Sequence, residues 1–157
     1  QVVKAVRNAT DLPIIAKLCP TITDVTILAR VCEEAGADAI CPIYAVMGVV
    51  IDIHTRRSKL GNNLLASVGG PWMKPIAVKL AWQAAQAVKI PIIGGGGITC
   101  AEDAIEFFIA GATAIQIGIY NFIDPQITIK TLEGIKKYLI EHRIKRIGDL
   151  VGSFRMS

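Results

Sequence analysis

The stretch Ile90-Pro-Ile-Ile-Gly-Gly-Gly-Gly-Ile-Thr-Cys-Ala-Glu-Asp103 decides the fold of this chain. A short β-branched run with a proline near its start predicts a buried strand, and four glycines follow it directly. Thr99 and Glu102 have the spacing of a capping box, which predicts that a helix begins here. Glycines let backbone N–H groups approach an anion, and a helix N-terminus adds partial positive charge, so this arrangement suits a phosphate. A plain tight turn is the alternative interpretation.

The composition favours one domain, or part of a larger one, with a well-filled core. The chain has 157 residues, of which 52% are hydrophobic and 19% charged, as expected where strands are buried on both faces. Its apolar stretches end well before the roughly 20 residues that a membrane helix needs. The four cysteines lack the paired spacing typical of zinc or iron–sulfur sites. We therefore expect a cytoplasmic protein with no membrane segment and no metal centre in this chain.

The positive charge of the chain raises the question of nucleic-acid binding. The net charge is +4, but the basic residues are scattered and no aromatic side chains are interleaved with them. A nucleic-acid surface combines clustered basic residues with stacking platforms. We therefore interpret these side chains as solvated faces and expect no nucleic-acid partner.

The chain contains one strand–helix–strand unit twice. Residues 12–15 match residues 90–93, and residues 35–40 match residues 110–115, at offsets of 78 and 75 residues. Similarity at a nearly fixed offset indicates one supersecondary unit used twice. In the first unit, Thr23 is expected to cap the helix.

Two such units predict four parallel strands with helices outside, because each unit runs right-handed and makes its strands parallel. An apolar periodicity over residues 73–89 predicts the helix that links the units, and residues 127–141 predict a further helix. Residues 44–71 form a long loop after a strand end, where barrel and open α/β proteins carry their sites.

This order of elements predicts an α/β fold, the later half of a (β/α)8 TIM barrel with about four parallel strands. Residues 1–157 would form that half-barrel as one unit, and the start at Gln1 inside a helical pattern suggests that a preceding segment has been cut away. An open doubly wound sheet is the alternative. Since a half-barrel leaves two strand edges unpaired, we expect the isolated chain to self-associate.

Several longer motifs occur in order along nearly the whole chain. They are Ala16-Lys-Leu-Cys-Pro20, Ile51-Asp-Ile53 with Thr55-Arg-Arg57, Gly70-Pro71 with Lys74-Pro75, the glycine run, and Asn121-Phe122 with Asp124-Pro125. With these motifs the sequence resembles the flavin-containing dihydroorotate dehydrogenases, in particular the catalytic subunit of the class that works with an iron–sulfur electron-transfer subunit. The resemblance implies a TIM barrel that holds FMN at the carboxyl ends of its strands.

The resemblance also implies which residues contact FMN. Two turns would bind the phosphate through backbone N–H groups, a lysine would stabilise negative charge on the reduced flavin ring, and two residues would line the ring. The positions are Lys17 for the charge, Ile43 and Gly70 for the lining, and Gly96, Gly97, Gly118 and Ile119 for the phosphate. Ile119 stands where the family has a threonine, although its N–H remains. A solvent-facing lysine is the alternative for Lys17, and a role in starting a helix is the alternative for Gly70.

Two further features depart from the family pattern. Tyr44 and Ala45 stand where the family has an Asn–Thr pair that hydrogen-bonds the pyrimidine, which places orotate binding in doubt. The family's catalytic base is a cysteine in the earlier half of the barrel, outside these residues. Because Cys19, Cys41 and Cys100 have no neighbouring histidine, we expect buried, inert thiols and assign no catalytic residue.

The resulting hypothesis is the C-terminal half of an FMN-dependent dihydroorotate dehydrogenase, an oxidoreductase of pyrimidine biosynthesis that converts dihydroorotate to orotate. It would supply the FMN phosphate cradle and act only in a complete barrel, so the isolated chain is predicted to be inactive. Its partners would be the pyrimidine substrate, the missing N-terminal half and an iron–sulfur/FAD electron-transfer subunit. The alternatives are a non-catalytic flavin- or phosphate-binding half-barrel and a related flavin barrel acting on another reduced pyrimidine.

Overall fold

The computed structural model describes residues 1–155 and contains four parallel strands. They are β1 (Ile15–Lys17), β2 (Ala39–Cys41), β7 (Ile93–Gly95) and β8 (Ala114–Gln116). β1 pairs with β2 and β7 pairs with β8. A parallel bridge between Ile40 and Ile92 places β2 beside β7. The resulting order β1-β2-β7-β8 confirms the four parallel strands predicted from the repeated unit.

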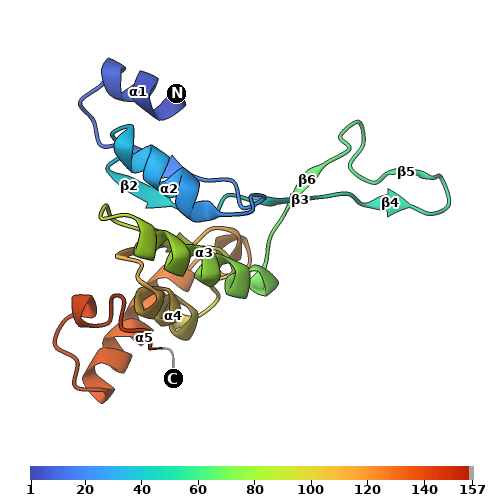
Figure 1. Cartoon of the computed structure of the whole chain (residues 1–157). Helices are drawn as coiled ribbons and strands as arrows, with labels where there is room; N and C mark the ends of the chain where they lie inside the picture. Colours follow the sequence, from blue (N-terminus) through green and yellow to red (C-terminus); the bar gives the residue numbers. More distant parts are fainter. Residues whose placement is uncertain (156–157) are drawn as a thin grey trace.

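Helices cover one face of these strands. They are α2 (Val25–Glu34), α3 (Lys74–Ala87), α4 (Ala101–Ala110) and α5 (Ile127–Glu141). Each contacts the next along the chain, as can be followed in Figure 1. Ala29, Ala77 and Ala104 are completely buried, and Ile40 and Phe107 fill the core beside them. In the described part of the chain, no helix is both long and apolar enough to cross a membrane.

The opposite face of the strands is only partly covered by the described residues, because β2 is buried on both faces whereas β1 is exposed on this face. Successive side chains of a strand point to opposite faces. In β1, Ala16 is 7% exposed, whereas its neighbour Ile15 is 56% exposed. Parallel sheets are normally covered on both faces. The fold is therefore an open part of a barrel, with helices outside and an exposed inner face.

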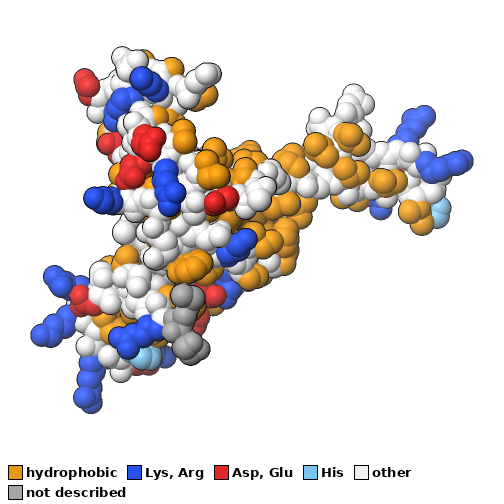
Figure 2. Space-filling model, viewed as in Figure 1, with side chains coloured by type: hydrophobic (Ala, Val, Ile, Leu, Met, Phe, Trp, Pro, Cys, Tyr) orange, Lys and Arg blue, Asp and Glu red, His pale blue; other side chains and the backbone are white. Residues whose placement is uncertain are grey.

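Residues 44–71 form an arm that extends away from the body in Figure 1. In this arm, β3 (Val46–Gly48) pairs antiparallel with β6 (Ala66–Val68), and β4 (Ile51–Asp52) with β5 (Arg57–Ser58). Figure 2 shows hydrophobic side chains along the base of the arm and lysine and arginine side chains at its tip. The sequence predicted a long segment here but not its strands, because strands without a buried face carry no clear alternation of apolar residues.

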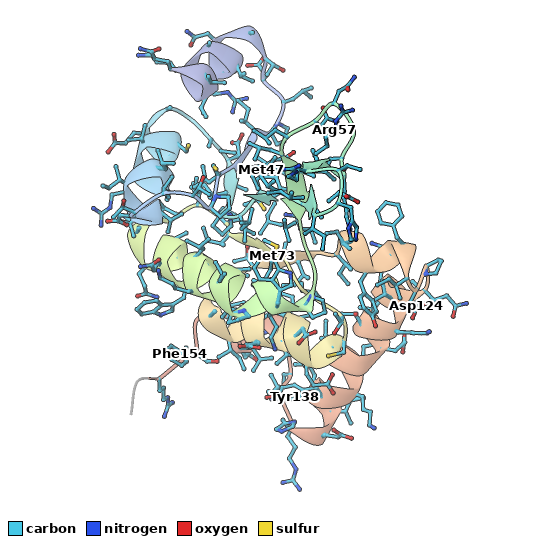
Figure 3. All side chains as sticks on the ribbon, turned by 90° about the vertical axis from the view of Figure 1, so that its right-hand side faces the viewer. Met47, Arg57, Met73, Asp124, Tyr138 and Phe154 are labelled. Atoms are coloured by element: carbon cyan, nitrogen blue, oxygen red, sulfur yellow. The ribbon has the colours of Figure 1, made fainter. Side chains whose placement is uncertain are left out.

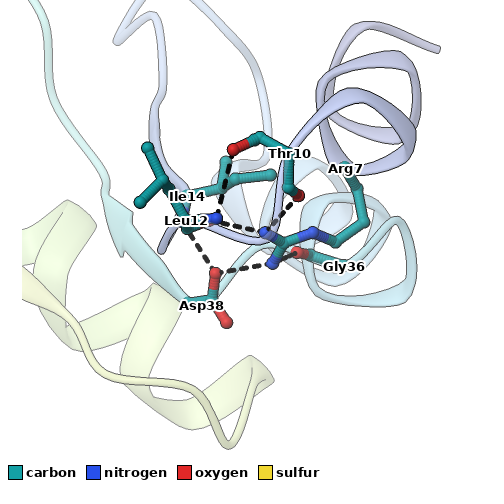
Figure 4. A network of polar contacts seen from close by, with 6 residues as sticks. All are labelled: Arg7, Thr10, Leu12, Ile14, Gly36 and Asp38. Carbon is teal, nitrogen blue, oxygen red and sulfur yellow. Dashed lines mark hydrogen bonds and ion pairs between the residues drawn. The ribbon is translucent and has the colours of Figure 1, made fainter.

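α1 (Val2–Ala9) has no buried side chain and is connected to the sheet by polar contacts. The guanidinium of Arg7 donates to the carboxylate of Asp38 and to the carbonyl of Thr10, each at 2.9 Å (Figure 4). Asp38 also accepts the N–H of Ile14 at 2.7 Å, and this bond together with Arg7 lowers the pKa of Asp38. The network fixes the path of the chain into β1.

The N-cap of α2 is Asp24 rather than the predicted Thr23. The Asp24 carboxylate accepts the N–H of Thr26 at 2.9 Å. Threonine and aspartate both cap helices well, so two adjacent candidates differ only in the local backbone path, which the sequence pattern does not specify.

Candidate functional site

A cavity of about 320 Å³ opens at the carboxyl ends of the strands. Its walls come from the end of β1, the two ends of the arm, and the turns after β7 and β8. One turn carries Gly96 and Gly97, and the other carries Gly118 and Ile119. β7 and β8 are paired neighbours, so both turns border the same cavity. Its size is typical of sites for small molecules.

The turn after β7 requires glycine at two positions. Gly96 and Gly97 have φ angles of +104° and +78°, a region that residues with a side chain rarely adopt. A Cβ on Gly97 would lie 2.7 Å from the backbone N of Lys74, and one on Gly96 would lie 3.1 Å from the Cβ of Ala77. The loop therefore lies directly against the first turn of α3.

Four backbone N–H groups at this cavity are available to a ligand. Within residues 1–155, the N–H groups of Gly96, Gly97, Gly118 and Ile119 have no hydrogen-bond acceptor. Folded proteins pair nearly all such groups with protein, water or ligand. Turns with successive free N–H groups form anion-binding concavities, and the N-terminus of α4 adds partial positive charge. The arrangement can therefore bind an anion with several oxygen atoms.

The other predicted contacts, Lys17, Ile43 and Gly70, also line this cavity. The Lys17 ammonium lies 5.8 Å from the ring centroid of Tyr44, within cation–π range. Met73, labelled near the centre of Figure 3, lines the cavity directly before the start of α3. All seven residues that the resemblance assigns to FMN thus surround one cavity, and their contact with FMN stays a prediction.

The side chain of Ile119 closes one side of the cavity. It packs so closely over Gly69 that a Cβ there would overlap the Cδ1 atom of the isoleucine. This contact joins the turn after β8 to the end of the arm. A threonine at this position could also donate a hydroxyl proton, whereas Ile119 offers only its backbone N–H.

A buried carboxylate fixes the end of the glycine loop. Asp103, which is 8% exposed in the first turn of α4, accepts the N–H and the hydroxyl of Thr99, each at 2.8 Å. Its second oxygen lies 2.8 Å from the Lys74 ammonium, which also lies 2.6 Å from the carboxylate of Glu106. The predicted capping box of Thr99 and Glu102 is wrong. The N-cap is Cys100, one residue after the predicted Thr99, so the third residue of α4 is Asp103, and this side chain accepts the bonds from Thr99.

The pKa of Asp103 predicts a loss of stability in acid. Burial alone would raise this pKa, but bonds from Lys74 and Thr99 outweigh burial and hold it at about 2, below the ordinary 3.8. A pKa lowered by folding contributes stability that is present above the unfolded value and is lost as the pH falls towards the folded value. We therefore expect protonation of Asp103 to lower the free energy of unfolding by about 2 kcal/mol as the pH falls from about 4 to about 2.

Urea unfolding at a series of pH values measures this loss. The Asp103→Asn variant should be less stable than the unsubstituted chain at pH 7, and its stability should fall less steeply on acidification. Lys74 stays charged throughout, because its bonds to Asp103 and Glu106 raise its pKa. Parallel stability curves for the two proteins would contradict the assignment.

One cysteine differs from the inert, buried thiols that were expected. Cys19 is exposed, and the Thr21 hydroxyl 2.8 Å from its sulfur lowers its pKa. Cys41 is buried, as expected, and Cys100 is half-buried; burial raises the pKa of both thiols. The sulfur of Cys41 accepts a hydrogen bond from the amide of Gln116, a cavity residue that the sequence analysis missed. In the sequence, Gln116 stands out as an uncharged polar residue inside an otherwise apolar strand, and this feature could have identified it.

Comparisons with known proteins place this chain among relatives of one family. The family model of dihydroorotate dehydrogenase matches residues 1–139. The dihydroorotate dehydrogenase B (NAD(+)) catalytic subunit of Thermodesulfovibrio yellowstonii is 49% identical over 155 residues, which are 99% of this chain and 51% of that protein. The subunit of the same name from Porphyromonas gingivalis is 48% identical over 152 residues, 97% of this chain and 49% of that protein. The chain spans about half the length of these relatives.

A solved structure shows the same fold. Dihydroorotate dehydrogenase from Eimeria tenella, in complex with ferulenol, superposes with a TM-score of 0.73 at 20% identity, covering 90% of this chain and 38% of that chain. At this identity the likeness supports the partial TIM barrel alone. The family match over most of the sequence goes further, and the chain belongs to the dihydroorotate dehydrogenase family.

Proposed function

We propose that this chain is the phosphate-binding half of an FMN-dependent dihydroorotate dehydrogenase. The N–H groups of Gly96, Gly97, Gly118 and Ile119 would bind the FMN phosphate, and Lys17 would lie at the flavin ring. The observation that carries the proposal is that these four groups, free of acceptors within residues 1–155, border one cavity. The N-terminus of α4 favours the negative charge of a phosphate at the same place.

The absence of side chains on the glycine loop also supports a phosphate site, because it leaves the backbone N–H groups accessible. Side chains at Gly96 and Gly97 would collide with α3, so the loop offers bare backbone at the cavity. Thr99 also lines the cavity, but its hydroxyl proton is already donated to Asp103. We therefore assign the phosphate to backbone groups and not to this hydroxyl.

When bound, FMN would supply the redox chemistry by accepting a hydride from a reduced pyrimidine. The chain itself would contribute orientation and charge. Lys17 places a cation at the cavity wall, where it would stabilise the negative charge that develops on the flavin ring. Among the described residues that line the cavity, none is a cysteine, histidine or carboxylate. We therefore propose that the base that removes the substrate proton belongs to the other half of the barrel.

The exposed inner face of the strands supports a second barrel half as partner. Ile15 on this face is 56% exposed, and this chain covers only 51% of the relative from T. yellowstonii. The relatives are named catalytic subunits of an NAD(+)-dependent enzyme, which implies an electron-transfer subunit. We propose that this subunit carries iron–sulfur and FAD centres, that the substrate is dihydroorotate, and that the assembly is cytoplasmic.

Titration of the 157-residue chain with FMN and with riboflavin tests the phosphate site. The two ligands share the flavin ring and differ by the phosphate. A hydrogen bond to a charged group contributes about 1.5–3 kcal/mol, so two such bonds increase the affinity for a ligand by roughly 100-fold or more. We expect FMN to bind at least about 100-fold more tightly than riboflavin, as measured by quenching of flavin fluorescence. Equal affinities would contradict the proposal.

A different reduced pyrimidine is the second candidate substrate. Tyr44 and Ala45 border the cavity, and Tyr44 is 59% exposed. A phenol and a methyl group do not reproduce the hydrogen bonds of an amide and a hydroxyl. Joining the first half of the T. yellowstonii relative in front of Gln1 gives a protein that we call the completed barrel. Faster flavin reduction in it by dihydrouracil than by dihydroorotate would favour this candidate.

The isolated chain is expected to self-associate. Its inner face exposes apolar side chains, and the strands β1 and β8 at the two ends of the row have free edges in the described residues. Sedimentation velocity should therefore show larger species that increase with protein concentration, and the completed barrel should show fewer of them. A single monomeric species at every concentration would contradict an exposed half-barrel.

A further inference from the structure

We infer that Lys74 and Asp103 are positioning residues for the phosphate site, and that together they hold the glycine loop against α3. Neither residue is among those that line the cavity. The inference rests on the proposed function, because it gives both residues a role in binding the FMN phosphate through the loop.

Asp103 holds the loop from the side of α4. Thr99 follows the loop directly, and both its N–H and its hydroxyl donate to one oxygen of the Asp103 carboxylate at 2.8 Å. Asp103 lies in the first turn of α4, where the helix dipole favours a carboxylate, and it is 8% exposed. A buried carboxylate with two bonds to one residue leaves that residue little freedom. The end of the loop is thereby fixed to α4.

Lys74 holds the same loop from the side of α3. Its ammonium lies 2.8 Å from the second oxygen of Asp103 and 2.6 Å from Glu106. Its backbone N is the atom that Gly97 lies against, since a Cβ on Gly97 would approach it to 2.7 Å. The backbone of Lys74 thus contacts the loop, and its side chain contacts Asp103, which holds the end of the loop. One ion pair joins the starts of both helices around the turn that carries Gly96 and Gly97.

A direct bond from Lys74 to the phosphate is the competing role. The ammonium already has two carboxylate partners, and the side chain does not reach the cavity lining of the described structure. Because both residues lie outside the cavity lining and act through the glycine loop, we expect the pair to affect binding of the phosphate and not binding of the flavin ring.

The test is the ratio of FMN affinity to riboflavin affinity in variants of the 157-residue chain. Lys74→Met and Asp103→Asn should each weaken FMN about tenfold, the equivalent of one hydrogen bond to a charged group, and leave riboflavin unchanged. The double variant should bind FMN about as tightly as the single variant with the lower FMN affinity, because the two residues act as one unit. The matched control is Lys136→Met, which breaks an exposed 2.8 Å ion pair with Glu133 on α5 and should change neither affinity.

The possible outcomes separate this inference from the proposed function. An unchanged FMN-to-riboflavin ratio in both variants, with a high ratio in the unsubstituted chain, would overturn the inference alone. Equal weakening of both ligands would also overturn it, because that is the mark of general destabilisation. An unsubstituted chain without a preference for FMN would overturn the proposed function and the inference together. If Lys74→Met does not fold, Asp103→Asn decides, because asparagine keeps the size of the side chain and removes its charge and its ion pair with Lys74.

Discussion

The Gly97→Ala substitution is expected to weaken FMN binding by roughly 100-fold or more. The new Cβ would lie 2.7 Å from the backbone N of Lys74, so the loop would have to move away from α3. The N–H groups of Gly96 and Gly97 would then be displaced from their positions at the cavity. The loss of two bonds to a charged phosphate, at about 1.5 kcal/mol each, corresponds to this factor. Fluorescence titration measures it, and circular dichroism checks that the variant is folded.

Gly61→Ala is the matched control for this prediction. Gly61 lies in the arm with a φ of +65°, and a Cβ there would meet no atom within 4 Å. Both substitutions therefore carry the cost of a left-handed backbone, about 1–2 kcal/mol, but only Gly97→Ala adds a collision. We expect Gly61→Ala to bind FMN as the unsubstituted chain does. Similar losses in the two variants would show that backbone strain, and not the contact with α3, weakens binding.

Oxidation of dihydroorotate is expected only from the completed barrel. The isolated chain offers the phosphate site and Lys17, but no cysteine, histidine or carboxylate lines the described cavity. General acid–base catalysis alone contributes about 100- to 10,000-fold, and half of the substrate site is missing as well. Turnover of the isolated chain with an added flavin acceptor should therefore stay at background. In the completed barrel, Lys17→Met should retain FMN and reduce the rate by roughly 100- to 1,000-fold.

Two results would change this account of the activity. Turnover by the isolated chain above background would show that it carries its own base. A completed barrel that binds FMN but oxidises neither dihydroorotate nor dihydrouracil would favour the non-catalytic half-barrel.

The repeated unit could be predicted from the sequence because its signals are local and strong. Short β-branched runs followed by turn residues predict strands, and an apolar periodicity of 3.6 residues predicts helices. α5 has the predicted boundaries, residues 127–141, and β1 (Ile15–Lys17) lies where the pattern placed a strand. The strand predicted before the glycine run is shifted, because β7 begins at Ile93 and includes the first two glycines of the run. The parallel order then follows from the handedness of the unit. The glycine loop was identifiable because Gly96 and Gly97 stand directly after a strand.

The contacts that shape the site could not be predicted in this way. Lys74 and Asp103 are 29 positions apart, and neither carries a local signal of the other. The same holds for the bond between Gln116 and Cys41, which joins β8 to β2 across the intervening strand β7. The pairing within the arm was missed because its strands have no buried face. Such features depend on tertiary packing, which single-sequence patterns do not encode.

Amide chemical shifts of the 15N-labelled chain during titration with FMN report directly on whether the two turns bind the phosphate. If the two turns bind the phosphate, the N–H signals of Gly96, Gly97, Gly118 and Ile119 should shift with FMN and remain in place with riboflavin. Gly61 in the arm serves as the internal reference and should not respond. Shifts confined to other residues, or equal shifts with both ligands, would contradict the claim.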